Sequence, residues 1–422
     1  MMRLKVLLVL ILSCYFPLLL CVENSAPKVS SKKTRYNENA LYPNKSDLKR
    51  YLLAITDGLN YFIEASIEEV YEKLNIMLWL SLMNGNLKSA LKRSGDNMDK
   101  EVKKYIEYLI LVGDKTIKYY KKRLHTNYTL HLLYSKLGNN EEVLVHGLKR
   151  FNSDDGSVSD IQMARFQQQW HSGCDYLKQS LFQLDRINET FYVHYPCIAS
   201  LAKNRRELSG NINSFGLTHC RLKKICRGIV KKWPNFGLYL VSRLMMLVLA
   251  NHMRGCAITV DDGARTKALC NQAFIESQYL AKNNKNMHSL MIYVALCSAS
   301  GERKFLQRRW FETLLDLQVN DGYFNGAIAR RYRHCAVNSI AEIWKFIPID
   351  LMKWDVEQFT AVSLAALSSA VRYIVQGQEA EIGREIGVSA ISTVKAVGNV
   401  STTSTSTVKP YGGYAPPGLE YL

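Results

Sequence analysis

The sequence predicts an all-α fold: an array of helix pairs stapled by disulfide bonds, for which an α/α-toroid is one arrangement. Three observations lead to this prediction. Apolar residues recur at the three- and four-residue spacing of amphipathic helices through most of residues 46–376, and no run shows the strict alternation of a half-buried strand. Nine prolines are few for a chain of 422 residues. Eight of the ten cysteines fall between Cys174 and Cys335.

The first helix of the body shows this spacing clearly. It opens at Ser46 and Asp47, and one face carries its apolar residues: Leu48, Tyr51, Leu52, Ile55, Leu59 and Phe62. The same spacing predicts further helices at 66–83, 100–123, from about residue 159, and at 237–254, 264–282, 286–299, 303–318, 334–346 and 357–376.

The chain opens with two basic residues followed by an apolar run. Arg3 and Lys5 precede the apolar residues 6–20. A basic segment before an apolar run of this length is typical of a secretory signal peptide. We therefore expect residues 1–21 to be a signal peptide and the protein to be secreted and extracellular. No later stretch is expected to span a membrane, since the strongest, 238–250, is interrupted by a serine and an arginine.

Composition divides the rest of the chain into three parts. Residues 22–45 are polar and basic and are expected to form a flexible leader. The helical domain should cover 46–376, with a cysteine-rich part at 170–346. Beyond it, hydrophobic periodicity fades, and the Ser/Thr-rich run "STTSTSTV" is followed by Gly and Pro. We expect 377–422 to be a disordered tail.

Export would expose the chain to glycosylation. The acceptor pattern Asn-x-Ser/Thr occurs at four positions, each expected on an exposed loop: Asn44, Asn127, Asn188 and Asn399. The protein is therefore predicted to be a glycoprotein.

Lysine and arginine outnumber aspartate and glutamate by 55 to 37. An exported protein with this charge would meet anionic glycans or lipid head groups rather than nucleic acid. The basic charge is concentrated in residues 221–233, where one helix face carries Arg221, Lys224, Arg227 and Lys231 and the other carries Leu222, Ile225, Ile229 and Trp233. This face is a candidate polyanion-binding site. The simpler interpretation is an ordinary solvated helix surface.

The segment "LLDLQVNDGYFNGAIARRYRHCAVNSI", residues 314–340, breaks a helical pattern with an Asp-Gly pair and two aromatics. Its Gln318-x-x-Asp321-Gly322-x-Phe324 resembles a single copy of the Gln…Gly-x-aromatic turns of α/α-toroid proteins such as terpenoid cyclases. In that interpretation Gly322 takes a positive φ and Phe324 returns to the core. A structural corner is therefore favoured over a catalytic loop.

An enzyme would need titratable groups brought together with opposite protonation states. The weak candidates are Asp262 beside Asp261, Asp321 and His334, and nothing in their spacing unites them. The chain has no glycine-rich phosphate loop, zinc-protease helix or serine nucleophile elbow. No cofactor is expected. The enzymatic alternative is an α/α-toroid enzyme acting on glycans, with Asp321 or Asp262 as acid or base and His334 assisting.

Residues 170–346 resemble an uncharacterised family of secreted animal proteins whose human member is named only as an open reading frame on chromosome 16. The resemblance rests on "GCDYL", "HCRLKKIC", "GLYLVSRLMMLVLANHMRGC", "LCNQAFIESQYLA", "SLMIYVALCS", "RRWFETLLDLQ…DGYF" and "HCAVNSIAEIW". It implies a secreted, disulfide-bonded, helical glycoprotein with no established reaction. Where the family has a second histidine or a threonine-rich run, this chain has Val337, Asn338 and Ser339, which argues against a metal at His334.

An even number of cysteines remains once Cys14 and Cys21 leave with the signal peptide. We predict the disulfides Cys256–Cys270 and Cys297–Cys335, each joining a helix end to a neighbouring helix. Cys174, Cys197, Cys220 and Cys226 are also expected to be paired, and in an oxidising compartment disulfides explain them better than a metal.

The function favoured by the sequence is that of an extracellular binding or structural protein without catalysis. The glycan-acting enzyme and the polyanion-binding protein are the alternatives. The ligand and the oligomeric state are left open, with a homo-oligomer as one outcome.

Overall fold

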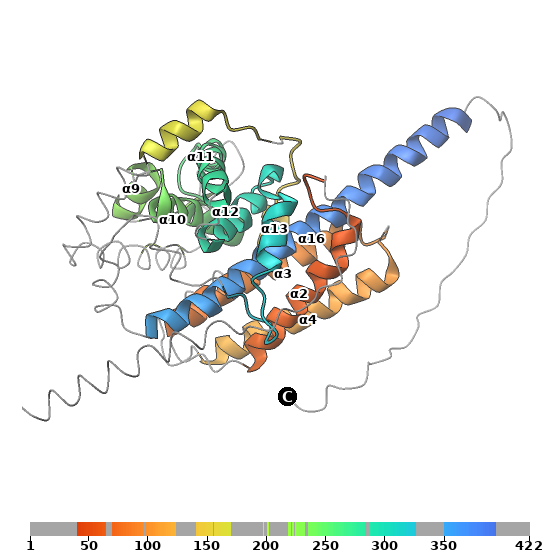
Figure 1. Ribbon diagram of the computed structural model, residues 1–422, viewed down its shortest axis with the longest axis horizontal. Coiled ribbons are helices and arrows are strands. Elements are labelled where there is room, and N and C mark those ends of the chain that lie inside the picture. Colours follow the sequence, from red (N-terminus) through yellow and green to blue (C-terminus); the bar gives the residue numbers. More distant parts are fainter. Residues whose placement is uncertain are drawn as a thin grey trace, which may run out of the picture.

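The computed structural model describes residues 40–64, 70–96, 98–123, 141–154, 156–169, 197, 201, 218–220, 222, 224–232, 235–282, 287–325 and 350–393 (Figure 1). Apart from loops and isolated positions, these residues form helices and two strands of two residues each, β1 (Thr218–His219) and β2 (Cys256–Ala257). The predicted all-α class is confirmed. The α/α-toroid arrangement stays a prediction.

The fold is organised around α16 (Asp350–Thr393), the long blue helix in Figure 1. It packs against α2 (Lys45–Glu64), α3 (Val70–Ser94) and α12 (Met287–Ala299). Residues 359–371 of α16 are buried on every side. Alanines and serines dominate this stretch, so neighbouring helices can approach closely, and a helix without a polar face belongs in a core.

One stretch of α16, Val356–Gly377, is long and apolar enough to cross a membrane by length and composition. The sequence prediction that 238–250 is the strongest such stretch is therefore wrong, whereas length and composition alone do not distinguish a membrane span from a core helix. In the structure 89 % of the apolar part of this stretch is buried inside the protein, which is typical of a central core helix.

The first of two helical groups contains α2, α3 and α4 (Lys100–Arg123). The predicted apolar face of α2, from Leu48 to Phe62, is buried as expected. Gly58 of α2 sits where a Cβ would lie 2.6 Å from Leu364 Cδ2, so the absence of a side chain lets α2 reach α16. The helix expected at 66–83 is longer than predicted and ends at Ser94 as α3.

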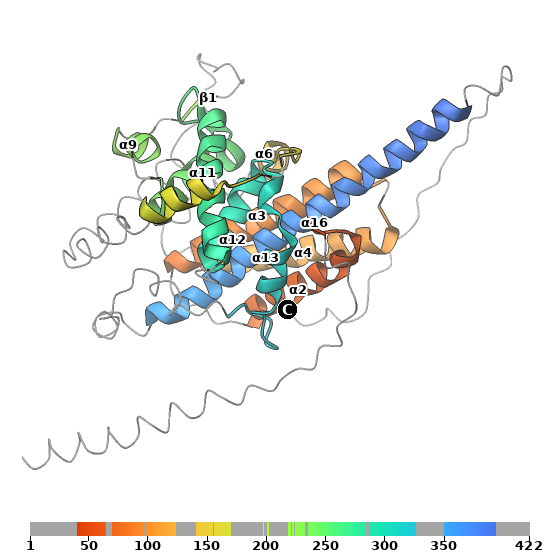
Figure 2. The same cartoon turned by 45° about the horizontal axis from the view of Figure 1, so that its top comes forward.

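The second group lies on the other side of α16, where α10, α11 and α12 gather (Figures 1 and 2). Its elements are α9 (Lys224–Lys232), α10 (Gly237–Val248), the π-helix η2 (Leu249–Arg254), α11 (Asp262–Lys282), α12, the short 3₁₀ helix η3 (Arg303–Phe305) and α13 (Arg308–Leu315). The short helix α6 (Glu141–Gly147) contacts both α3 and η2. A single helix was expected at 237–254, and the structure changes to π geometry at Leu249 before Gly255 ends it with φ +68°.

Three disulfides join elements of this second group: Cys197–Cys226, Cys220–Cys256 and Cys270–Cys297. The predicted pairings Cys256–Cys270 and Cys297–Cys335 are therefore wrong. The parallel pairing of β1 with β2 places Cys220 beside Cys256, with Cα atoms 5.2 Å apart, and the packing of α11 on α12 brings Cys270 within 5.8 Å of Cys297. Cys174 and Cys335 lie outside the described residues.

The predicted domain limits also need correction. The end of the expected flexible leader is packed, because Leu41 accepts a backbone hydrogen bond from Arg308 and the Tyr42 ring contacts Tyr373. At the other end, α16 continues past Gly377 to Thr393 instead of giving way to the tail. A helix-interior glycine costs only about 1 kcal/mol, which the good helix formers Gln, Glu and Ala that follow can offset.

Candidate functional site

The basic face of α9, defined here as Lys224, Arg227 and Lys231, is the candidate binding surface. All three side chains are exposed, while Cys226 and Val230 on the opposite side are buried. Alternation at this helical spacing orients the apolar side to the core and the charges to solvent. The fourth predicted member, Arg221, lies outside the described residues.

Two contacts fix α9 to the rest of the protein. The disulfide Cys197–Cys226 holds its buried side, and Nε of Arg243 in α10 donates a 3.0 Å hydrogen bond to the carbonyl oxygen of Val230. Arg243 also donates to Asn235 Oδ1. The basic face is therefore presented by a helix anchored from beneath, which holds its three charges in a defined arrangement.

The candidate Asp262 has a structural role at the start of α11. It is buried, and its carboxylate accepts hydrogen bonds from the backbone nitrogens of Ile258 (2.6 Å) and Thr259 (2.8 Å) and from the Thr259 hydroxyl (2.7 Å). These donors hold the turn between β2 and α11. Asp261 beside it is exposed, and its carbonyl oxygen accepts the backbone N–H of Arg265.

The loop after α13 is a structural corner, as predicted. Nε2 of Gln318 donates to the carbonyl oxygens of Ala54 in α2 and Gly322 in its own loop, both at 3.0 Å. Gly322 has φ +86°, and a Cβ there would lie 2.2 Å from the Asp57 carbonyl oxygen. Phe324 is fully buried, and its backbone N–H donates to the Thr360 hydroxyl of α16.

The corner leaves Asp321 exposed at its tip. Within the described part of the chain, no hydrogen bond or ion pair joins Asp321 to Asp262: the donors to Asp262 come from its own turn, whereas the loop of Asp321 packs on α2 and α16. His334 lies outside the described residues. Of the predicted catalytic candidates, the structure therefore does not bring the two described ones, Asp262 and Asp321, together.

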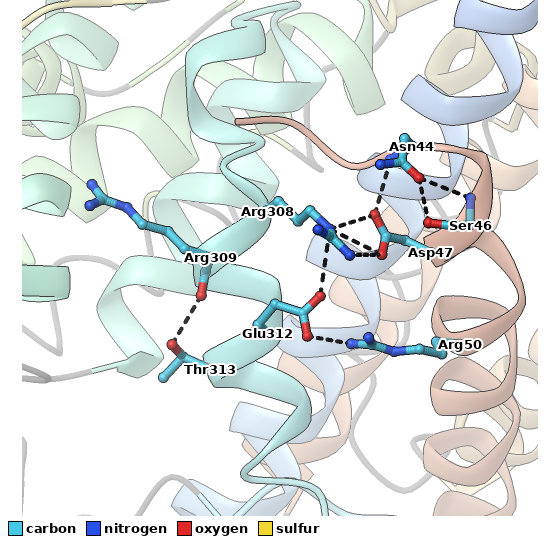
Figure 3. Close-up of polar contacts among 8 residues, drawn as sticks. All are labelled: Asn44, Ser46, Asp47, Arg50, Arg308, Arg309, Glu312 and Thr313. Atoms are coloured by element: carbon cyan, nitrogen blue, oxygen red, sulfur yellow. Dashed lines mark hydrogen bonds and ion pairs between the residues drawn. The ribbon is translucent and has the colours of Figure 1, made fainter. Parts of the chain in front are cut away.

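An ion-pair network, buried at Asp47 and Arg308 and partly exposed at Arg50 and Glu312, joins the start of α2 to α13 (Figure 3). Arg308 contacts Asp47 through both Nε and Nη2, with a shortest distance of 2.8 Å. Glu312 of α13 lies 3.8 Å from Arg308 Nε and accepts a hydrogen bond from Arg50 at 2.5 Å. Burial raises the pKa of Tyr51, which lies beside this network.

Sequence spacing does not indicate this network, because its members on α2 and α13 are more than 250 residues apart. One local signal was available. Asn44 and Asp47 are three residues apart, as in a capping box, and Asp47 does accept the Asn44 backbone N–H at 3.1 Å. That signal identifies a helix start, and it contains no information about Arg308.

Asn44 is the one predicted glycosylation position within the described residues. It is half-buried rather than on an exposed loop, and its Oδ1 accepts hydrogen bonds from the backbone N–H and the hydroxyl of Ser46. This oxygen therefore caps α2. Asn127, Asn188 and Asn399 lie outside the described residues.

A buried carboxyl that the sequence did not single out is Glu276 of α11. It is fully buried, and its oxygens accept the backbone N–H of Gly237 at the start of α10, at 3.0 and 3.2 Å. Burial raises the pKa of Glu276 to about 7, against hydrogen bonds from Gly237 and Tyr293 that lower it. A carboxyl that titrates near neutrality could serve in proton transfer, but here it stabilises a helix N-terminus inside the core.

Comparisons of the chain with protein-family models, with curated proteins and with solved structures find no match.

Proposed function

We propose that this protein is a secreted, disulfide-bonded helical glycoprotein that acts as an extracellular binding or structural protein without catalysis. The observation that carries the proposal is the set of three disulfides within the described residues. Cys197–Cys226 holds α9, Cys220–Cys256 joins the end of β1 to β2, and Cys270–Cys297 joins α11 to α12. Such bonds form and persist in oxidising compartments, and the apolar leader offers a route to one.

The environments of the predicted catalytic residues support the non-catalytic half of the proposal. Asp262 already accepts three hydrogen bonds from its own turn, and Asp321 is at the exposed tip of a packed corner. A general acid or base must lie within hydrogen-bond reach of the proton that it transfers. The oxygens of Asp262 are already occupied by its own turn, and Asp321 lies on a different part of the fold.

Expression of the full chain in an animal cell line tests the proposal. We expect the protein in the medium, without residues 1–21, and with peptide mapping under non-reducing conditions recovering all three disulfides. Retention in the cytosol with an intact first methionine and titratable thiols would overturn it. Treatment with a glycosidase that removes N-linked glycans should lower the apparent mass, and an unchanged mass would refute the glycoprotein assignment.

A second candidate function, polyanion binding, is favoured by the basic face of α9. Lys224, Arg227 and Lys231 follow i, i+3, i+7 spacing, so their charges lie along about 10 Å of one helix face. A sulfated glycan carries anionic groups along its length and could engage all three charges at once. Binding of this kind releases counterions and weakens as salt rises.

Heparin chromatography of two triple variants tests this second candidate. We expect Lys224→Gln/Arg227→Gln/Lys231→Gln to elute at lower salt than a control with the same charge change on exposed residues of α4, Lys104→Gln/Lys115→Gln/Lys122→Gln. Equal elution of the two variants would show that net charge alone, and not the face of α9, retains the protein on heparin.

A further inference from the structure

Arg372, near the middle of α16, is a fully buried arginine in the core. Its Nη2 donates a 2.7 Å hydrogen bond to the carbonyl oxygen of Ser298 in the last turn of α12, and its guanidinium lies 4.4 Å from the centroid of the Phe151 ring. The carbonyl at a helix C-terminus and the aromatic face both favour a cation. Of these two contacts only the first is a hydrogen bond, and it satisfies one nitrogen, Nη2.

The other nitrogens of Arg372 are unsatisfied. Nε and Nη1 are buried and have no hydrogen-bond partner. The Phe151 ring has no lone pair that could accept a hydrogen bond from these N–H groups. Buried donors in native proteins are almost always bonded, to protein, to water or to an ion, and an unbonded buried charge is costly. The two free nitrogens therefore mark a place for an acceptor.

The charges around Arg372 indicate the sign of that acceptor. Burial, together with the positive charge of Arg93, lowers the pKa of Arg372 to about 9, so the group remains a cation at neutral pH. Lys149 and Arg372 together lower the pKa of buried His252 beyond the effect of burial itself. No carboxylate of the described residues forms an ion pair with Arg372. The region has an excess of positive charge.

Two hydroxyl groups near this position also lack partners. The Oγ atoms of Ser298 and Ser300 are buried and unbonded. Ser298 is the same residue whose carbonyl oxygen accepts from Arg372, and Ser300 follows it at the end of α12. Hydroxyl and guanidinium N–H groups are both donors to an anion. An anion could therefore accept hydrogen bonds both from the guanidinium and from a hydroxyl at this end of α12.

We propose that Arg372 binds a small inorganic anion of the size of chloride in the protein core, with the hydroxyl of Ser298 as a second donor. Complete burial of the guanidinium excludes a macromolecule or a sugar chain as the ligand. The anion neutralises Arg372 and bonds Nε and Nη1. It thereby holds α16 to the C-terminal end of α12, and it stabilises the folded chain by an amount that grows with the anion concentration.

Thermal unfolding of the full chain in sodium chloride, sodium bromide and sodium gluconate at equal ionic strength tests the proposal. We expect the Tm to be higher by about 1–3 °C in either halide than in gluconate, because a ligand that binds the folded state raises the Tm. Arg372→Gln should abolish this difference. The exposed control Arg165→Gln removes the same charge and should keep it.

A difference between halide and gluconate that persists in Arg372→Gln, or its absence from the unmodified chain, would overturn the anion site and leave water as the partner of Nε and Nη1. If Arg372→Gln does not fold, crystals of the unmodified protein grown with bromide give an independent answer. An anomalous peak within hydrogen-bond distance of Arg372 Nε or Nη1 supports the site. A crystal with bromide elsewhere and none at Arg372 refutes it.

Discussion

Asp47 and Arg308, 261 residues apart in the chain, form a two-nitrogen ion pair from which solvent is almost fully excluded: the side chains are 0 % and 7 % exposed. The pair fastens the first turn of α2 to the first turn of α13. It thus joins the two helical groups at the N-terminal ends of α2 and α13.

Removing one partner of this pair should be strongly destabilising. We expect Asp47→Asn to lower the free energy of unfolding by about 3–5 kcal/mol, because it leaves a buried guanidinium without its counter-charge. Urea denaturation measures the change. The exposed pair of Glu101 and Lys104, with side chains 81 % and 71 % exposed, supplies the control, and Glu101→Gln should cost less than about 1 kcal/mol. Equal costs would contradict the structural role of Asp47.

Glu276 should make the folded state less stable as the pH rises. Its folded pKa of about 7 exceeds its ordinary value of 4.5, so the folded state binds more protons than the unfolded chain between these values. Stability from this group is complete below pH 4.5 and declines towards pH 7, by up to about 3 kcal/mol. Glu276→Gln should remove the decline when unfolding is measured across this range. A profile unchanged by the substitution would contradict the assignment.

His252 should make the folded state more stable as the pH rises, over part of the same pH range. Burial lowers its pKa from 6.5 to about 4, so the unfolded chain binds the extra proton first. Its contribution is complete above pH 6.5 and is lost as the pH falls towards 4. In the Glu276→Gln variant we therefore expect stability to rise with pH across this window, and His252→Asn should flatten that rise. If the rise persists in His252→Asn, a group other than His252 causes the loss of stability at low pH.

Two glycine substitutions should have opposite effects. Gly322→Ala is expected to destabilise the protein by more than about 1 kcal/mol, because a side chain would meet the Asp57 carbonyl oxygen and the residue has a positive φ. Gly377→Ala, in α16 with nothing within 4 Å of the new Cβ, should stabilise by about 0.5–1 kcal/mol. Denaturation midpoints compare them. Tolerance of alanine at 322 would refute the corner geometry.

The disulfide between α11 and α12 should contribute measurably to stability. Replacing Cys270 and Cys297 together by alanine removes a cross-link across 27 residues of sequence and should cost about 2–4 kcal/mol. Unfolding under non-reducing conditions measures the loss. Peptide mapping of the same variant should still recover Cys220–Cys256, whereas appearance of Cys256 in another pair would contradict the strand pairing that positions it.

Local patterns in the sequence predicted the helices and the faces they bury. Spacing alone identified the core face of α2, the two-sided character of α9, and the corner in which Gly322 turns the chain and Phe324 returns to the core. These features depend on residues a few positions apart, so periodicity and the steric freedom of glycine are sufficient to determine them.

Tertiary structure decided which distant residues meet. Cys256 pairs with Cys220 because two short strands align, and Asp47 meets Arg308 because α2 and α13 pack together. The sequence around Arg372 does not indicate that it is buried, because the residues that contact it, Ser298 and Phe151, are distant in the sequence. Sequence spacing cannot rank such pairings, because each depends on how all the helices pack at once. The sequence by itself thus determined the helical elements, their buried faces and the basic face of α9, and long-range packing determined the disulfide pairs and the buried charges.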